Sequence, residues 1–190
     1  MSIHLSLTDD RFDLTPLSKS ICASSNFRFA WQFYEYYGPD QESVDSIRSA
    51  LNLIATDDSL HGFLRSSLDD IYPRDFEIEP LHEHATIKQD GSYFLDTVTR
   101  ASLDRLGAYS RNLSSSTAAE RKPVDELFSS IGQYLAFNTE PGSQAGCDIC
   151  GHHNNDLITN WYYDVAWDYT FILTWPHASV LWFGCLTDTD

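Results

Sequence analysis

Apolar and polar positions alternate most regularly near the end of the chain. From residue 161 to 175, in WYYDVAWDYTFILTW, every odd position is apolar or aromatic. Alternation with a period of two is typical of a β-strand with one buried face. The segment is longer than an ordinary strand, so we expect a bulge or bend near residues 164–166. A turn at 176–179 and the apolar run VLWFGCL at 180–186 complete a predicted hairpin at the heart of a sheet.

Helical periodicity dominates the earlier part of the chain. The segment 25–38, SNFRFAWQFYEYYG, fits both the helical and the strand period, and we favour a helix. Pro123 is expected in the first turn of its helix, where a proline lacks only an N–H that would be unpaired anyway. The segments with a clear apolar stripe at helical spacing are 41–55, 60–72, 92–110 and a helix that begins at Pro123.

The order of these elements predicts the fold class. Helices followed by strands are typical of an α+β fold. We expect a single domain over residues 1–190, with about four to five helices packed on a small antiparallel sheet that contains the C-terminal hairpin. A two-stranded hairpin is only marginally stable by itself, so further strands must come from residues 1–17 or 76–87.

The charge of the chain is strongly negative and unevenly distributed. Asp and Glu number 28 against 12 Lys and Arg, which gives a net charge of −16. Residues 123–190 contain nine acids and no Lys or Arg. Such a charge disfavours nucleic acids and anionic membranes as partners and favours a basic protein. The N-terminal sequence shows no signal-peptide pattern and no apolar run has the length of a membrane helix, so we expect a cytoplasmic protein.

The segment 147–153, CDICGHH, is the strongest candidate for a chemical site. It lies in a long polar loop predicted at 138–156. A Cys-x2-Cys pair can place two thiolates on one zinc ion, and a histidine can complete such a site. The favoured prediction is nevertheless no cofactor and a mobile polar loop with reduced thiols, and the alternative is one structural zinc. The candidate ligands are Cys147, Cys150, His152 and His153 with His82 or His84.

An enzymatic function is the less favoured interpretation. A metal-dependent hydrolase would use His82, His84, Cys147, Cys150 and His152. Alternatively, Cys150 with His152 would act without metal, as a thiol nucleophile and its base. The chain contains no Gly-rich phosphate loop, no Gly-x-Ser-x-Gly elbow and no His-Glu-x-x-His motif. We therefore expect no catalytic activity. The remaining cysteines, Cys22 and Cys185, have apolar neighbours and are predicted to be buried.

The acids of the terminal hairpin are candidates for partner binding. If the odd face of 161–175 is buried, the even positions form an exposed face with two carboxylates about 13 Å apart, a tyrosine and Thr170. Aromatic side chains supply interface area and acids steer a basic partner. The alternative is that these acids only keep the face soluble. The predicted contact residues are Asp164, Asp168, Tyr162, Asp148 and Asp156.

In size, acidity and its terminal hairpin, WYYDVAWDYTFILTWPHASVLWFGCL, the chain resembles the immunity proteins of bacterial polymorphic and contact-dependent toxin systems. The resemblance implies an inhibitor that neutralises a cognate toxin by covering its active site; many such toxins are basic nucleases. A second possibility is a phage-type DNA mimic, which requires carboxylates about 7 Å apart on alternate strand positions. Here the strand acids are spaced more widely, which favours the toxin inhibitor.

Overall fold

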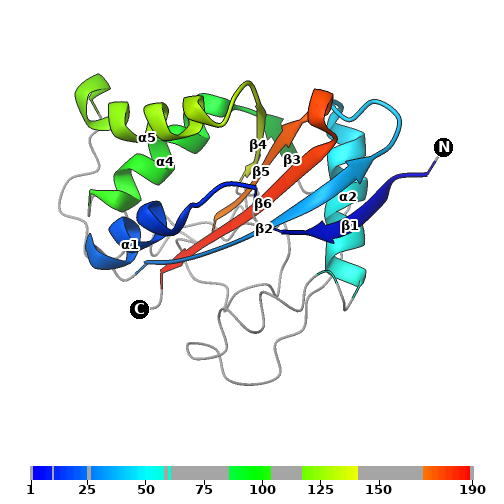
Figure 1. The fold of residues 1–190 in the computed structure, drawn as a ribbon, viewed down its shortest axis with the longest axis horizontal. Helices are drawn as coiled ribbons and strands as arrows, with labels where there is room; N and C mark the ends of the chain where they lie inside the picture. Colours follow the sequence, from blue (N-terminus) through cyan, green and yellow to red (C-terminus); the bar gives the residue numbers. More distant parts are fainter. Residues whose placement is uncertain are drawn as a thin grey trace, which may run out of the picture.

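The computed structural model describes residues 2–9, 11–24, 27–57, 60, 86–103, 117–140 and 169–188. Within these ranges, four α-helices cover both faces of a six-stranded antiparallel sheet (Figure 1). The predicted α+β fold with a C-terminal hairpin is confirmed. The helices are α1 (Thr15–Ser24), α2 (Val44–Thr56), α4 (Gly91–Ser102) and α5 (Ala118–Ser130). The strands are β1 (His4–Thr8), β2 (Phe27–Tyr37), β3 (Thr86–Gln89), β4 (Leu135–Glu140), β5 (Tyr169–Trp175) and β6 (Val180–Asp188).

The hairpin β5–β6 lies at the centre of the sheet, as predicted. The strand order is β1-β2-β6-β5-β4-β3, so β6 pairs with both β5 and β2. A short 3-10 helix, Pro176–Ala178, and Ser179 with a φ of 51° close the hairpin and place Trp175 opposite Val180. Of the segments expected to supply further strands, 1–17 contains β1, whereas β3 shares only residues 86 and 87 with 76–87, whose other residues lie outside the described ranges.

Both faces of the central strands are buried. On one face, α2 packs on a cluster that includes Tyr34, Ile172 and Phe183. On the other face, α1, α4 and α5 pack on a second cluster that contains Phe33 and Trp182. Figure 1 shows these three helices on one side of the sheet and α2 towards its other end. The sheet is therefore the middle of three layers, not a surface with one side in water.

Burial on both faces corrects the expected exposure of the terminal strand. Thr170 and Thr174 occupy even positions of β5, yet only 3% and 0% of their surfaces are exposed. Ile172 between them is buried as well. The prediction of an exposed even face is therefore wrong for the described part of the strand. The alternation that we interpreted as buried against exposed is an alternation between two buried environments.

The segment 25–38 is the clearest error of secondary-structure assignment. It forms β2 rather than a helix, and pairs with β1 on one edge and with β6 on the other. Its aromatic residues enter both clusters: Phe29 and Phe33 lie on the face of α1, α4 and α5, and Tyr34 and Tyr36 lie on the face of α2. A strand with rings on both faces shows no strict alternation, which is why the helical period fitted equally well.

Side-chain caps set the starts of α2 and α5, which bear on two of the predictions. Ser43 accepts a hydrogen bond from the Ser46 N–H and begins α2 close to the predicted position. The capping box of Thr117 and Glu120 begins α5. Pro123 therefore lies inside this helix and not in its first turn, which corrects our expectation. The predicted helix at 60–72, apart from Leu60, and residues 104–110 of the helix predicted at 92–110 lie outside the described residues.

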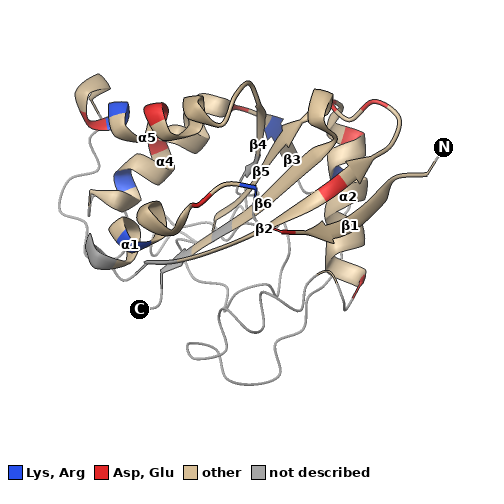
Figure 2. Ribbon diagram, in the orientation of Figure 1, with Lys and Arg blue, Asp and Glu red and all other residues tan. Residues whose placement is uncertain are grey.

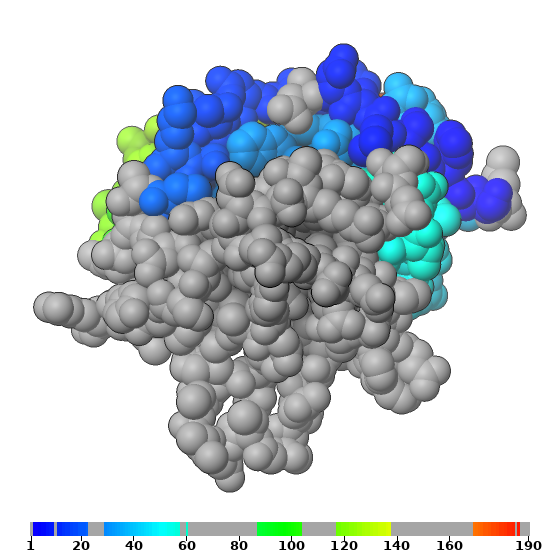
Figure 3. All heavy atoms as spheres, turned by 90° about the horizontal axis from the view of Figure 1, so that it is seen from below, coloured from blue at the N-terminus to red at the C-terminus, as the bar shows by residue number. Residues whose placement is uncertain are grey.

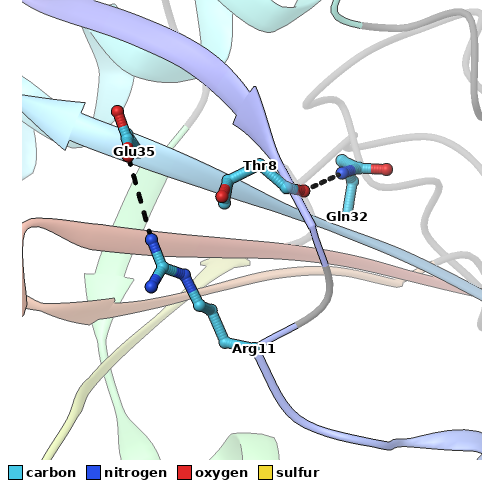
Figure 4. Close-up of polar contacts among 4 residues, drawn as sticks. All are labelled: Thr8, Arg11, Gln32 and Glu35. Atoms are coloured by element: carbon cyan, nitrogen blue, oxygen red, sulfur yellow. Dashed lines mark hydrogen bonds and ion pairs between the residues drawn. The ribbon is translucent and has the colours of Figure 1, made fainter.

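The chain between β1 and α1 is attached to β2 by polar contacts (Figure 4). The side-chain amide of Gln32 donates to the carbonyl oxygen of Thr8 at 3.1 Å. Arg11 and Glu35 form an ion pair at 3.9 Å between partly exposed side chains. An exposed pair of this kind contributes little stability, so the hydrogen bond is the more important of the two contacts.

Helix α1 carries Cys22, which is exposed and not buried as predicted. The side chain of Cys185 lies outside what the structure describes.

The largest buried side chain, Trp182, lies over a glycine of its own strand. A Cβ atom on Gly184 would come within 2.8 Å of three indole atoms, Cη2, Cζ2 and Cζ3. The indole also packs against the rings of Phe29, Phe94 and Phe128, at centroid distances of 6.0, 5.9 and 6.4 Å. One ring thus joins β6 to β2, α4 and α5, and it lies flat enough to do so only because residue 184 lacks a side chain.

We therefore expect Gly184→Ala to destabilise the protein by about 1–3 kcal/mol or more, because the added methyl group displaces a tightly packed indole. The measurement is the free energy of unfolding in urea. Gly91→Ala is the matched control, since its Cβ would meet only the Ala136 Cβ at an ordinary 3.8 Å in the first turn of α4. Equal stability of Gly184→Ala and wild type would contradict this packing.

Candidate acidic groove beside helix α2

The side chains that the sequence singled out for function all lie outside the described residues. The structure therefore neither brings them together nor separates them, and the zinc site and the strand contacts stay predictions. The side chains predicted to bind metal are Cys147, Cys150, His152, His153, His82 and His84, and those predicted to bind a partner are Asp148, Asp156, Tyr162, Asp164 and Asp168. The site described below is built from other residues.

An open groove of about 540 Å³ runs along α2. One wall is formed by Ser2 and Ile3, which precede β1, and by Pro39, which follows β2. Close contact between Ile3 and Gly38 holds these two segments together. Figure 3 shows the N-terminal segment (dark blue) beside α2 (cyan). The other wall is α2 itself, which contributes Asp45, Ser46, Ser49, Asn52, Leu53 and Thr56.

The helical pattern of α2 explains this wall. Ile47, Ala50, Leu51 and Ile54 are fully buried against the sheet. Since side chains three, four and seven positions apart share one side of a helix, the polar groove residues form a second stripe, away from the apolar one. The sequence contains this polar stripe, but by itself the stripe indicates only a solvated helix face. The opposite wall comes from two other segments, and no local pattern signals that they approach α2.

The three hydroxyl groups that α2 contributes to the groove donate their protons to the backbone. Ser46 Oγ donates to the Pro39 oxygen at 2.8 Å, and Ser49 Oγ donates to the Asp45 oxygen at 2.9 Å. Thr56 Oγ1 donates to the Asn52 oxygen at 2.7 Å. What these side chains offer to a ligand is therefore the lone pairs of their oxygens. Together with the Asp45 carboxylate, they make the groove rich in hydrogen-bond acceptors; the other side-chain donors of the lining are the Ser2 hydroxyl and the Asn52 amide.

The surroundings of the groove are acidic. Residues 38–57 contain four acids and one base, Arg48. Asp40, Glu42 and Asp45 are exposed near the start of α2, and no ion pair joins them to a basic side chain in the part of the chain that the structure describes. The three-helix layer differs, because Arg100 and Lys122 pair with acids of their own helices, Asp96 and Glu126. The charges are shown in Figure 2.

Tyr36 lies behind the groove and is fully buried. Its hydroxyl group is next to Ser46 and makes no well-formed hydrogen bond. Burial raises the pKa of Tyr36 to about 12; the negative charge of Asp40 adds to the rise and the Ser46 hydroxyl opposes it. The phenol is therefore neutral at physiological pH and acts as part of the core, not as an acid or base.

The groove carries no catalytic set. Its lining has hydroxyl groups, one amide and one carboxylate, but no histidine, cysteine or lysine that would activate a nucleophile. Among the described residues, no three His, Cys, Asp or Glu side chains gather where they would hold a metal ion. The described helices also include none that is long and apolar enough to cross a membrane. What this arrangement can do chemically is accept hydrogen bonds and attract positive charge.

Comparison with known proteins adds no further assignment. A scan against protein-family models finds no match, and a search of curated proteins finds none either.

The raised pKa of Tyr36 predicts a loss of stability at high pH. The folded protein keeps the phenol proton up to about pH 12, whereas the unfolded chain loses it near pH 10. The contribution is thus complete below pH 10 and is lost as the pH rises from about 10 to 12. We expect Tyr36→Phe to reduce this alkaline loss by about 2–3 kcal/mol and to change stability at pH 7 by less than about 1 kcal/mol.

The measurement is urea unfolding at a series of pH values from neutral to alkaline. Tyr134, whose pKa burial also raises to about 12, contributes in the same window, so part of the alkaline loss remains. Tyr37→Phe, at the exposed neighbour, is the control for removing a phenol oxygen. An unchanged alkaline loss in Tyr36→Phe would show that the Tyr36 hydroxyl reaches solvent in the folded protein.

Proposed function

We propose that this protein is an acidic inhibitor that neutralises a basic partner, such as a cognate bacterial toxin, by covering the active site of that partner. It acts in the cytoplasm, as a binding protein and not as an enzyme. The observation that carries the proposal is the uncompensated negative charge: −16 over the chain, with no Lys or Arg in residues 123–190.

The described surface supports this proposal in a place that the sequence did not single out. Exposed Asp45 lines a groove that also exposes part of Leu53, and the exposed acids Asp40 and Glu42 lie in the segment just before α2. Negative charge accelerates the encounter with a basic protein, and apolar contact then slows dissociation. Exposed Tyr37 and Val44 on the same end of the molecule provide additional contact area.

The three-layer architecture supports an inhibitor in a second way. A sheet that is covered on both faces is a rigid support, and a rigid surface binds with a smaller loss of conformational entropy. Inhibition by coverage needs no chemistry from the inhibitor, only a stable surface of complementary charge. The hydroxyl-lined groove without a base is consistent with this requirement.

The proposal predicts a partner whose binding depends on salt. Affinity purification on the full chain from its source cells should recover one basic protein at about 50 mM salt and lose most of it at about 500 mM, because salt screens exposed charges. The product of an adjacent toxin-like gene is the first candidate. When that product is expressed alone it should arrest growth, and co-expression with this protein should restore growth.

Two results would contradict the proposed function. One is the recovery of no basic protein at either salt concentration. The other is stoichiometric zinc in the purified protein together with hydrolytic activity, which would favour the metal-dependent hydrolase.

Reversal of charge at three described acids, in an Asp40→Lys, Glu42→Lys, Asp45→Lys variant, should reduce the rate of association with the basic partner. The reduction should be far larger at low salt than at high salt.

A further inference from the structure

We infer that the groove beside α2 is a docking site for an extended segment of a partner protein that carries arginine or lysine next to an apolar side chain. This inference rests on the proposed function and names the surface and the chemistry of the contact. It moves the expected contact from the terminal strand to α2 and the N-terminal segment.

The dimensions of the groove fit a peptide segment. From Asp45 to Thr56, α2 rises by about 16 Å, at 1.5 Å per residue. An extended chain of about five residues covers this length. The groove is open along its side and is not an enclosed cavity, so it suits a segment of a larger protein better than a small molecule that must be buried on most of its surface.

Hydrogen bonding selects a cation as the occupant. The hydroxyl groups of Ser46, Ser49 and Thr56 donate hydrogen bonds to backbone carbonyl oxygens, so only their oxygen lone pairs remain for a ligand in the groove. Guanidinium and ammonium groups are donors with no acceptor capacity. An anion or a carbonyl group would find few donors here, whereas arginine or lysine satisfies the acceptors and also neutralises Asp45.

The peptide dipoles of α2 also favour a cation at the C-terminal end of this helix. The last turn of α2 carries a partial negative charge from the aligned peptide dipoles, and it contains no basic residue. Thr56, in that turn, lines the groove. A second cation is therefore favoured about three helical turns from Asp45. Between the two ends, Leu53 and Ile3 offer apolar contact for a side chain that lies between two basic residues.

A second copy of this chain is a poor occupant. Each copy has a net charge of −16, and residues 38–57 carry three negative charges more than positive ones. Two such surfaces repel each other unless a basic segment from elsewhere intervenes. Charge complementarity therefore selects a basic partner over self-association.

The test uses the full chain and a defined probe. The probe is an acetylated peptide of about eight residues with an Arg-Leu-Arg core between Gly and Ser flanks. Its control has citrulline in place of each arginine, which keeps the shape and removes the charge. We expect the arginine peptide to shift the backbone amide resonances of α2 between Asp45 and Thr56, and the citrulline peptide to leave them in place.

A matched pair of variants locates the binding. Ser49→Lys places a cation in the groove and should weaken binding of the arginine peptide at least about tenfold. Ser129→Lys makes the same change at an exposed position of α5, in the other layer, and should retain the wild-type affinity. Thermal unfolding of both variants checks that each is folded. Equal weakening by both variants would overturn the groove as the site, because it would indicate only a general effect of net charge.

Other outcomes separate this inference from the proposed function. A recovered basic partner that binds Ser49→Lys as tightly as wild type would overturn the groove and leave the proposed function intact. Peptide binding that is lost only in Ser49→Lys, without any basic partner from the cell, would support the groove and reject the proposed function. Equal binding of the citrulline peptide, or concentration-dependent shifts of the α2 amides without any peptide, would overturn the inference.

Discussion

The burial of the β5–β6 hairpin on both faces is the constraint on which the described structure depends. Its apolar side chains point in both directions, so a helical layer is needed on each side. The indole of Trp182, lying over Gly184, joins the sheet to α4 and α5 on one side. On the other side α2 is the only described helix, and its outer face, with Asp45, Ser49 and Thr56, is exposed.

The two helical layers differ in charge as well as in composition. In α4 and α5, basic side chains lie one turn from acids and pair with them. Around α2 the acids outnumber the bases, and three of them have no described ion-pair partner. Local pairing within a helix stabilises that helix and leaves little net field, whereas unpaired acids project a field into solvent. The described charges of α4 and α5 thus stabilise their own helices, whereas the unpaired acids around α2 can attract positive charge from solution.

Periodicity predicted the elements whose environments differ strongly between their two sides. The stripe of α2 has a buried and a solvated side, and its helix was predicted within a few residues. Strand β2 has rings on both sides, so the contrast disappears and the period becomes ambiguous. Pro123 was misplaced because the capping box at Thr117 begins the helix earlier. The groove could not be predicted, because its walls come from segments that meet only in the folded chain.

Burial of the even positions of β5 changes the basis for the inhibitor hypothesis. When the even face of the strand was expected in water, Asp164 and Asp168 were predicted to form its binding surface. Thr170 and Thr174 are enclosed by the core, so a partner that approaches β5 itself would meet α2 or the other helices instead. The even positions of the described part of β5 therefore offer no exposed contact to a partner, and the contacts predicted at Asp164 and Asp168 lie outside the described residues. The groove between α2 and the N-terminal segment is one described place where a carboxylate, acceptor oxygens and exposed apolar surface occur together.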